Sequence, residues 1–187
     1  MRADAVRNRE AVLRAAGRLF DAADDPERVS MDDVAAAAGV GKGTLFRRFG
    51  DRAGLIRALY EERAERLYAS LEPDPGRPAA DAVGDLMSAL LRFKIENRAL
   101  ARAFENAGGG PYTASGYDRL HSRLTGLMTE ARGPDSADFL AHALLAGVRS
   151  DLVEHLGDWP EERLRAGMAA LVRSVLSGGG SPGRPER

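Results

Sequence analysis

Cysteine is absent from the 187-residue chain. Its absence excludes disulfide bonds, thiolate metal sites and cysteine nucleophiles. Long apolar runs are also lacking: no segment approaches the roughly 18 consecutive apolar residues that a membrane-spanning helix needs. Residues 1–4 do not begin the apolar stretch of a secretory signal peptide. From these absences we expect a cytoplasmic protein that does not contact a membrane.

Charge of one sign is not in excess, because 27 Lys and Arg residues and 28 Asp and Glu residues leave a net charge of −1. A near-neutral chain is not suited to coating nucleic acid indiscriminately, so any contact with DNA has to come from a local basic patch. Lysine is scarce, with only Lys42 and Lys94, whereas arginine, alanine and glycine are abundant. A GC-rich genome favours these abundant residues, so the arginine count by itself is weak evidence for function.

Helical periodicity recurs along the chain, while runs of alternating β-branched and aromatic residues are scarce. Three prolines within residues 72–78 interrupt the helical pattern and mark a boundary. We therefore predict an all-α protein: a helix-turn-helix domain at residues 1–50, a long connecting helix at 51–72, a C-terminal helical bundle at 73–177 and a disordered Gly-, Pro- and Ser-rich tail at 178–187. The first helix is expected to end near residue 23, and the others to span 31–38, 42–49, 52–71, 79–97, 98–106, 116–131, 136–156 and 160–176.

The segment from Ser30 to Phe49 has the pattern of two short helices joined by a tight turn. Ser30 is a typical N-cap residue, and Gly39 lies where the turn requires a positive φ angle. Leu45 and Phe49, four residues apart, are expected to face inward on the second helix. The outward face then offers these residues to the major groove of DNA: Lys42, Gly43, Thr44, Phe46, Arg47 and Arg48.

Positive charge is concentrated around this second helix. Residues 40–58 contain five basic side chains and one acidic side chain, a local net charge of +4 in a chain whose total is −1. Such a concentration is what the neutralisation of DNA phosphates requires. The basic residues are Lys42, Arg47, Arg48, Arg52 and Arg57, and the acidic residue is Asp51.

The ordered pattern of about the first 60 residues resembles the TetR family of regulators. The family usually has an N-cap residue where Gly41 stands, tyrosine where Phe46 stands and lysine where Arg52 stands. The last of these departures keeps the positive charge. The matching residues are Val12-Leu13, Ala15-Ala16, Leu19-Phe20, Ser30-Met31-Asp32-Asp33-Val34-Ala35, Ala38-Gly39-Val40-Gly41-Lys42-Gly43-Thr44-Leu45-Phe46, Arg47-Arg48-Phe49, Asp51-Arg52 and Leu55.

The resemblance implies a DNA-binding role for the matching positions around the second helix. Thr44 and Arg47 would read base edges in the major groove, where arginine suits guanine. The other residues of this interface would position the helix, chiefly through phosphates: Ser30, Lys42, Gly43, Phe46, Arg48 and Arg52. Three further arginines are candidates for the DNA backbone or the minor groove: Arg2, Arg7 and Arg9. The function implied is a repressor that a small-molecule effector releases from a palindromic operator.

The last two helices are amphipathic, and the resemblance implies that they pair with those of a second copy of the chain. The same apolar stripes also fit an intramolecular core. A two-fold dimer would place two recognition helices on a palindromic DNA site. The candidates for the dimer interface are Leu140, Ala143, Leu144, Gly147, Leu164, Met168, Leu171 and Val175.

The apolar residues of the middle helices fill a bundle core or line a pocket for an apolar or aromatic effector, which would also need a few polar groups. An effector that prefers a conformation with separated recognition helices would lower operator affinity, with the helix at 52–71 as the link. The candidates for the pocket are Leu86, Leu90, Phe93, Phe104, Tyr117, His121, Leu124, Met128 and Arg149.

Two other functions remain open on the residues alone: a helical-bundle enzyme or carrier with a vestigial DNA-binding head, and an architectural DNA-binding dimer without an effector. The intact basic recognition face disfavours the first, and the low global charge disfavours the second. No catalytic set, cofactor or metal site is expected. The glycine-rich residues 39–44 lack the spacing of a phosphate-binding loop, and the three histidines are scattered: His121, His142 and His155.

Overall fold

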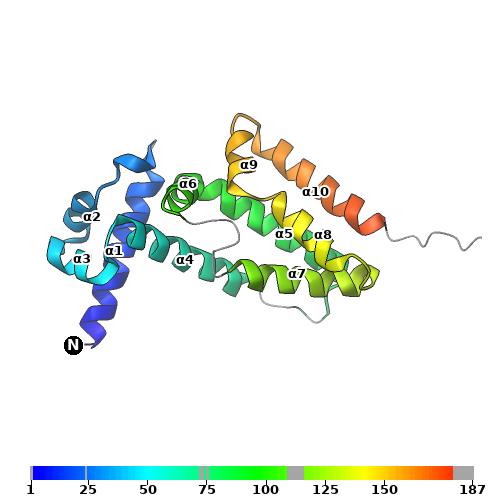
Figure 1. Ribbon diagram of the computed structural model, residues 1–187, viewed down its shortest axis with the longest axis horizontal. Coiled ribbons are helices and arrows are strands. Elements are labelled where there is room, and N and C mark those ends of the chain that lie inside the picture. The colour runs from blue at the N-terminus through cyan, green and yellow to red at the C-terminus, as the bar shows by residue number, and fades with distance from the viewer. Residues whose placement is uncertain (1, 24, 72–73, 75, 109–115, 179–187) are drawn as a thin grey trace, which may run out of the picture. The chain divides into compact units, whose positions relative to one another are not determined.

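A computed structural model describes the backbone of residues 2–23, 25–71, 74, 76–108 and 116–178. These residues form ten α-helices and one short 3-10 helix, with no strand among them, which confirms the all-α prediction (Figure 1). No helix in this part of the chain is both long and apolar enough to span a membrane. Apart from Gly178, the tail predicted to be disordered lies outside the described residues.

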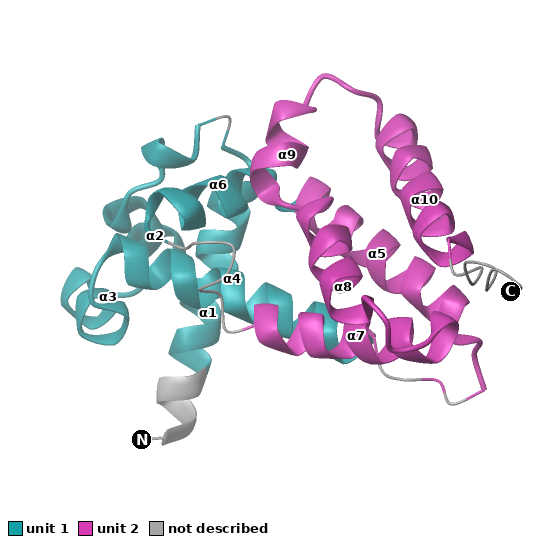
Figure 2. Cartoon of the chain, turned by 45° about the vertical axis from the view of Figure 1, so that its right-hand side comes forward, with its two compact units in different colours: residues 1–70, 96–114 teal, residues 71–95, 115–187 magenta. Residues whose placement is uncertain are grey.

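The chain divides into two compact units (Figure 2), and the first contains the helix-turn-helix segment. Unit 1 comprises α1 (Arg2–Asp21), the 3-10 helix η1 (Pro26–Arg28), α2 (Met31–Ala38), α3 (Lys42–Phe49), α4 (Arg52–Ser70) and α6 (Arg98–Asn106). The inclusion of α6 differs from the sequence-based boundary at residue 72, which assigned α6 to the C-terminal bundle. In the structure α6 packs against α1, η1 and α4.

The core of unit 1 forms because successive helices bury apolar side chains in one cluster. Leu13 and Phe20 of α1, Val34 of α2, Leu45 of α3 and Ile56 of α4 are all buried. Burying a large apolar side chain contributes roughly 1.5–3 kcal/mol relative to leaving it exposed. Because isolated helices as short as α2 and α3 are unstable in water, this packing is what holds them in place.

Local hydrogen bonds define the two ends of α2. Oγ of Ser30 accepts from the backbone N–H of Asp33 at 3.2 Å, and Oδ2 of Asp33 accepts from the backbone N–H of Ser30 at 3.1 Å. This reciprocal pair is a capping box. Gly39 ends the helix with a φ of 66°, a left-handed conformation that glycine adopts without a steric penalty. The predicted N-cap and turn are therefore confirmed.

Arg63 of α4 joins α1 to α6. Its guanidinium donates to the two carboxylate oxygens of Asp21 at 2.8 and 2.9 Å and to Oδ1 of Asn97 at 2.6 Å. Asn97 precedes α6 and is only 7% exposed, so its amide requires a partner inside the protein. The rings of Tyr60 and Phe104 stack with centroids 4.4 Å apart. Polar and aromatic contacts thus both attach α6 to unit 1.

Unit 2 contains α5 (Ala79–Glu96), α7 (Tyr117–Arg132), α8 (Ala137–Ala146), α9 (Ser150–His155) and α10 (Glu161–Ser177). Helix α8 packs on α7, and α10 packs on both. The Nζ of Lys94 on α5 donates to Oγ of Ser150 at 2.8 Å and so ties α5 to the start of α9. The core of the unit includes Leu86, Met87, Leu124, Met128 and Leu144.

The prediction of a single helix at 136–156 is wrong, because α8 and α9 are separate helices. Gly147 follows α8 and lies so close to α10 that a Cβ atom there would be 3.2 Å from two of its side chains. Arg149 then has an extended backbone, with φ −64° and ψ 144°, and its guanidinium holds the carboxylate of Asp151 at 2.7 and 3.0 Å. Glycine has a low helix propensity, and this local ion pair favours the break.

Replacing Ser30 by alanine is expected to lower the free energy of unfolding by about 1 kcal/mol, the usual cost of a lost N-cap. Ser88→Ala, at an exposed position within α5, is the matched control. It should leave stability unchanged or slightly raise it, because alanine is the better helix former. Urea denaturation followed by circular dichroism measures both variants, and equal stabilities would show that the capping box contributes nothing.

The capping box also makes this stability difference depend on pH. Hydrogen bonds from the side chain and the backbone of Ser30 lower the pKa of the Asp33 carboxyl. A carboxyl with a lowered pKa stabilises the fold at pH values above its unfolded pKa, and this contribution is lost as the pH falls through the folded-state pKa. The difference between the natural protein and Ser30→Ala should therefore shrink on acidification across that range.

Candidate nucleic-acid interface

Helix α3 is held by two buried residues and exposes most of the others. Leu45 and Phe49 are buried, which confirms their predicted inward orientation. Because they lie one helical turn apart, they turn the opposite face of α3 outward. Thr44 is half-buried, and the exposed residues are Lys42, Gly43, Phe46, Arg47 and Arg48.

The outward face of α3 combines an aromatic ring with a positioned guanidinium. Phe46 is 46% exposed, although it is a large apolar residue. The Nη2 of Arg47 donates to Oγ1 of Thr44 at 3.3 Å, which joins two residues one turn apart. An exposed arginine on a helix of this kind suits the O6 and N7 acceptors that guanine presents in the major groove.

Lys42, the first residue of α3, has an acidic neighbour on α2. Its Nζ lies 2.5 Å from Oδ2 of Asp32, and the side chains of both residues are exposed. Ser30, another candidate for a phosphate contact, uses its hydroxyl in the capping box. Of the N-terminal candidates, Arg7 and Arg9 are exposed on α1. The side chain of Arg2 lies outside the described part of the structure.

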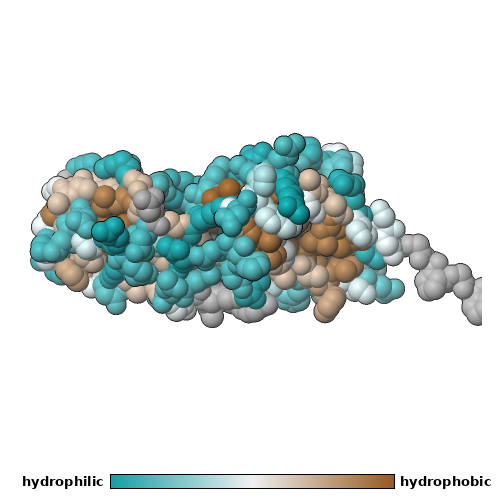
Figure 3. Space-filling view, turned by 90° about the horizontal axis from the view of Figure 1, so that it is seen from above, coloured by the Kyte–Doolittle hydropathy of each residue, from teal (hydrophilic) through white to brown (hydrophobic). Residues whose placement is uncertain are grey.

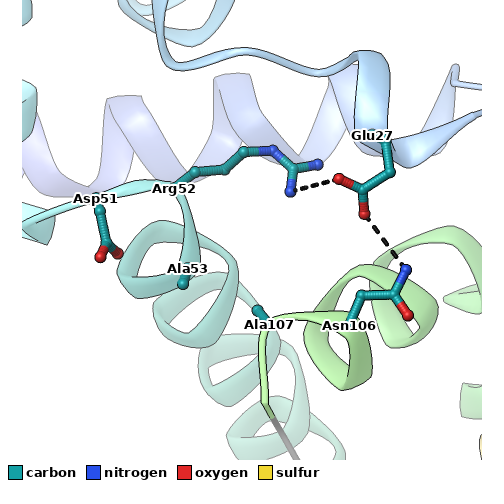
Figure 4. A pocket seen from close by; sticks show the side chains of 6 residues that line it. All are labelled: Glu27, Asp51, Arg52, Ala53, Asn106 and Ala107. Atoms are coloured by element: carbon teal, nitrogen blue, oxygen red, sulfur yellow. Dashed lines mark hydrogen bonds and ion pairs between the residues drawn. The ribbon is translucent and has the colours of Figure 1, made fainter.

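Arg52, for which the family resemblance implied a phosphate contact, bonds to groups of the protein itself in this structure. Its Nε donates to the carbonyl of Val29 at 3.0 Å, its Nη2 donates to the carbonyl of Pro26 at 2.6 Å, and its Nη1 lies 3.1 Å from Oε2 of Glu27. Figure 4 shows the guanidinium pointing toward Glu27. In this structure, Arg52 connects the start of α4 to η1 and its flanking backbone.

An open cleft of about 550 Å³ lies beside this ion pair, between η1, the start of α4 and the end of α6. On its wall, Nδ2 of Asn106 donates to Oε1 of Glu27 at 3.4 Å (Figure 4). Sequence reasoning missed both residues, since no local pattern links positions 79 residues apart. The residues that line the cleft are Glu27, Asp51, Arg52, Ala53, Asn106 and Ala107.

The pocket candidates are divided between the two units. Phe104 belongs to unit 1, where it stacks on Tyr60, whereas the apolar candidates of unit 2 are buried in that unit. Arg149 is bound to Asp151, and hydrogen bonding from Arg149 lowers the pKa of the Asp151 carboxyl. The buried apolar candidates of unit 2 are Leu86, Leu90, Phe93, Leu124 and Met128.

Two of the three histidines, expected to be scattered, meet where α7 packs on α8. The rings of His121 and His142 stack with centroids 3.8 Å apart, and the hydroxyl of Tyr117 lies 2.6 Å from Nδ1 of His142. The Nε2 of His121 lies 3.1 Å from the carbonyl oxygen of Asp138. Among the described residues, no three His, Cys, Asp or Glu side chains are grouped to hold a metal ion.

The candidates for the dimer interface divide by exposure. Leu144, Leu164 and Met168 are buried within the protomer, so in this structure they are part of its own core. Phe139, which the sequence analysis did not select, is 70% exposed on α8. In the space-filling view, apolar side chains reach the surface on the part of unit 2 that leads to the C-terminal segment (Figure 3). Ala143 and Leu171 are exposed, and three candidates are half-buried: Leu140, Gly147 and Val175.

The exposed face of α3 and the turn before it define a helix-turn-helix protein with a second, helical unit. Residues 12–59 match the model of the family described as "Bacterial regulatory proteins, tetR family". An HTH-type transcriptional regulator of Staphylococcus aureus (strain USA300) is 31% identical over 107 residues, which are 56% of this chain and 57% of the relative. The chain therefore spans little more than half the length of the curated relatives that it matches.

Two solved structures extend the similarity along the chain. A transcriptional regulator from Rhodococcus sp. RHA1 superposes with a TM-score of 0.74 at 21% identity, over 93% of this chain and 99% of that chain. A TetR transcriptional regulator from Streptomyces coelicolor is 29% identical, with a TM-score of 0.55, over 93% of this chain and 99% of that chain. The first similarity shows the fold. Taken together, these findings show a TetR-type segment at residues 12–59 and support a transcriptional regulator of the TetR family.

Replacing Arg52 by methionine keeps an apolar stem but removes the guanidinium that binds Glu27 and two carbonyls. We expect the free energy of unfolding to fall by about 1–3 kcal/mol, the scale of hydrogen bonds that involve a charged group. Arg57→Met makes the same charge change at an exposed position of α4 and should alter stability by less than about 0.5 kcal/mol. Chemical denaturation compares them, and equal losses would rule out the structural role of Arg52.

Proposed function

We propose that this protein binds double-stranded DNA through α3 and regulates transcription, as a repressor that a small-molecule effector releases from a palindromic operator. The observation that carries the proposal is the outward face of α3. Leu45 and Phe49 use one side of the helix for packing, which leaves Arg47, Arg48 and the ring of Phe46 exposed on the other. A short helix presented in this way fits the major groove.

Roles within the proposed interface follow from chemistry and position. Arg47, held beside Thr44, is the proposed base reader because its guanidinium can donate two parallel hydrogen bonds to guanine. Lys42 and Arg48 are proposed to neutralise phosphates, which fixes the register of the helix on the duplex. Phe46 replaces the tyrosine usual in the family, so it offers van der Waals contact without a hydroxyl donor.

A palindromic operator requires a two-fold dimer. We propose that α8 and α10 form its interface, with the exposed residues Phe139, Ala143 and Leu171 at the contact. Exposed large apolar side chains are typical of the centre of such interfaces. The interface candidates that are buried, such as Leu144 and Met168, would support that surface from within the protomer.

The effector is proposed to bind in unit 2, where α5 and α7 bury apolar side chains. Buried Leu90, Phe93 and Met128 would suit an apolar or aromatic molecule, and Arg149 would supply polar recognition. An effector that binds more tightly to the conformation with separated recognition helices lowers operator affinity, and DNA lowers effector affinity by the same factor. The DNA-binding and effector-binding conformations are then in competition.

Selection of bound sequences from random double-stranded DNA, followed by footprinting, tests the function directly. A single palindromic motif is expected. Sequence-indifferent binding, or no binding, would overturn the proposal and favour a helical-bundle enzyme or carrier with a vestigial DNA-binding head. Titration of the selected operator complex with apolar and aromatic small molecules then tests release. If no compound in a broad panel changes operator affinity, the effector part of the proposal fails.

Arg47→Ala is expected to weaken binding to the selected operator by about 1–3 kcal/mol and to relax the base preference at one position of each half-site. The physical reason is the loss of a bidentate contact to a base edge. Arg92→Ala, an exposed arginine of α5, removes the same charge away from α3 and is the control. Fluorescence anisotropy measures the affinity of both variants for the operator and for base-substituted operators. Equal affinities and equal base preferences of the two variants would exclude Arg47 as a base reader.

Phe139→Glu is expected to shift the protein toward monomer, because a carboxylate would be buried against apolar side chains at the proposed two-fold contact. Phe46→Glu makes the same substitution on α3 and should leave the oligomeric state unchanged. Sedimentation velocity over a range of protein concentrations measures both. A dimer that survives Phe139→Glu with unchanged affinity would place the interface elsewhere.

A further inference from the structure

The carboxylate of Asp32 on α2 forms an ion pair with the ammonium group of Lys42, the first residue of α3. The Nζ of Lys42 is 2.5 Å from Oδ2 of Asp32, and the two side chains are 64% and 59% exposed. The two residues are ten positions apart, and the turn at Gly39 brings them together. The contact is therefore a product of the helix-turn-helix geometry and not of one helix.

The position of Lys42 explains why a nearby carboxylate is favourable there. A helix N-terminus carries partial positive charge, so a cation in the first turn is disfavoured. Helix α3 has no acidic residue in its first turn, and its N-cap is Gly41, which has no side chain to accept a hydrogen bond. Asp32 supplies from α2 the negative charge that α3 itself lacks. It also lies in the first turn of α2, where a carboxylate is favoured by that helix.

We propose that Asp32 is a positioning residue that holds Lys42 in the free protein and competes with DNA phosphate for it. This inference rests on the proposed function. When α3 approaches a duplex, a phosphate oxygen replaces the Asp32 carboxylate as the partner of the ammonium group. Breaking the internal pair offsets part of the gain from the phosphate contact, so Asp32 lowers the affinity of the protein for DNA.

The exchange also affects the dependence of binding on salt. Each phosphate that a protein cation neutralises releases condensed counterions and contributes about 0.9 to the slope of log K against log salt concentration. In the natural protein, Asp32 loses its internal partner on binding and recruits a solution cation, which cancels part of that release. Without the carboxylate at residue 32, the full release at Lys42 should be seen.

The test compares Asp32→Asn with the natural protein on the selected operator and on a non-cognate duplex. We expect binding to both to tighten roughly two- to fivefold, the scale of an exposed ion pair, and the salt slope to steepen by up to about one per protomer. Asp32→Glu retains the carboxylate and should restore natural affinity and slope. Asp81→Asn, an exposed carboxylate in the first turn of α5, is the charge-matched control and should change neither.

Whether Asp32 acts on DNA binding through its pairing with Lys42 is tested by repeating Asp32→Asn in a Lys42→Gln background. The gain in affinity and the change in slope should both disappear there. If the gain persists, Asp32 acts only by repelling DNA, and the proposal is overturned; unchanged or weaker binding by Asp32→Asn overturns it as well. Circular dichroism and thermal denaturation of each variant show whether α3 is still folded. Failure of the natural protein to bind any duplex would instead overturn the proposed function.

Discussion

The structure depends on one constraint: α3 has eight residues and cannot persist without the packing of unit 1. Helices shorter than about 12–15 residues are marginal in water. Leu45 and Phe49 supply the burial that holds α3 in place, and Gly39 supplies the left-handed turn that brings it back onto α2. The same two anchors decide which side chains face outward, so the exposure of Arg47 is a consequence of packing on the opposite face.

The net charge counted along the sequence around α3 differs from the charge found there in the fold, because acidic residues from other segments lie nearby. The local net charge of +4 counts only residues 40–58. Two acidic residues outside this range form ion pairs with its basic residues: Glu27 pairs with Arg52, and Asp32 pairs with Lys42. The positive charge of residues 40–58 is therefore partly balanced at Lys42, where α3 begins, and at Arg52, where α4 begins. A folded helix-turn-helix balances attraction for phosphate against its own internal ion pairs.

Features set by neighbouring residues were predictable from the sequence, and features set by distant residues were not. The N-cap at Ser30, the bounds of α3 and its inward Leu45 and Phe49 follow from spacing alone. The break after α8, where Gly147 lies against α10 and Arg149 pairs with Asp151, is not revealed by the periodicity within 136–156. The partners of Arg52 lie 23 and 26 residues away, so its structural role emerged only from the fold.

Helix α6 shows how far such distant contacts alter the organisation of the chain. The sequence singles out α4 as the continuous connection between the DNA-binding segment and the rest. In the structure, Arg63 binds Asn97 at the start of α6, while Asn106 at its end binds the same Glu27 that holds Arg52. Both ends of α6 are thus joined to elements that position α2 and α3. Under the proposed regulation, a displacement of α6 would disturb these hydrogen bonds directly, so α6 as well as α4 would transmit the change to α3.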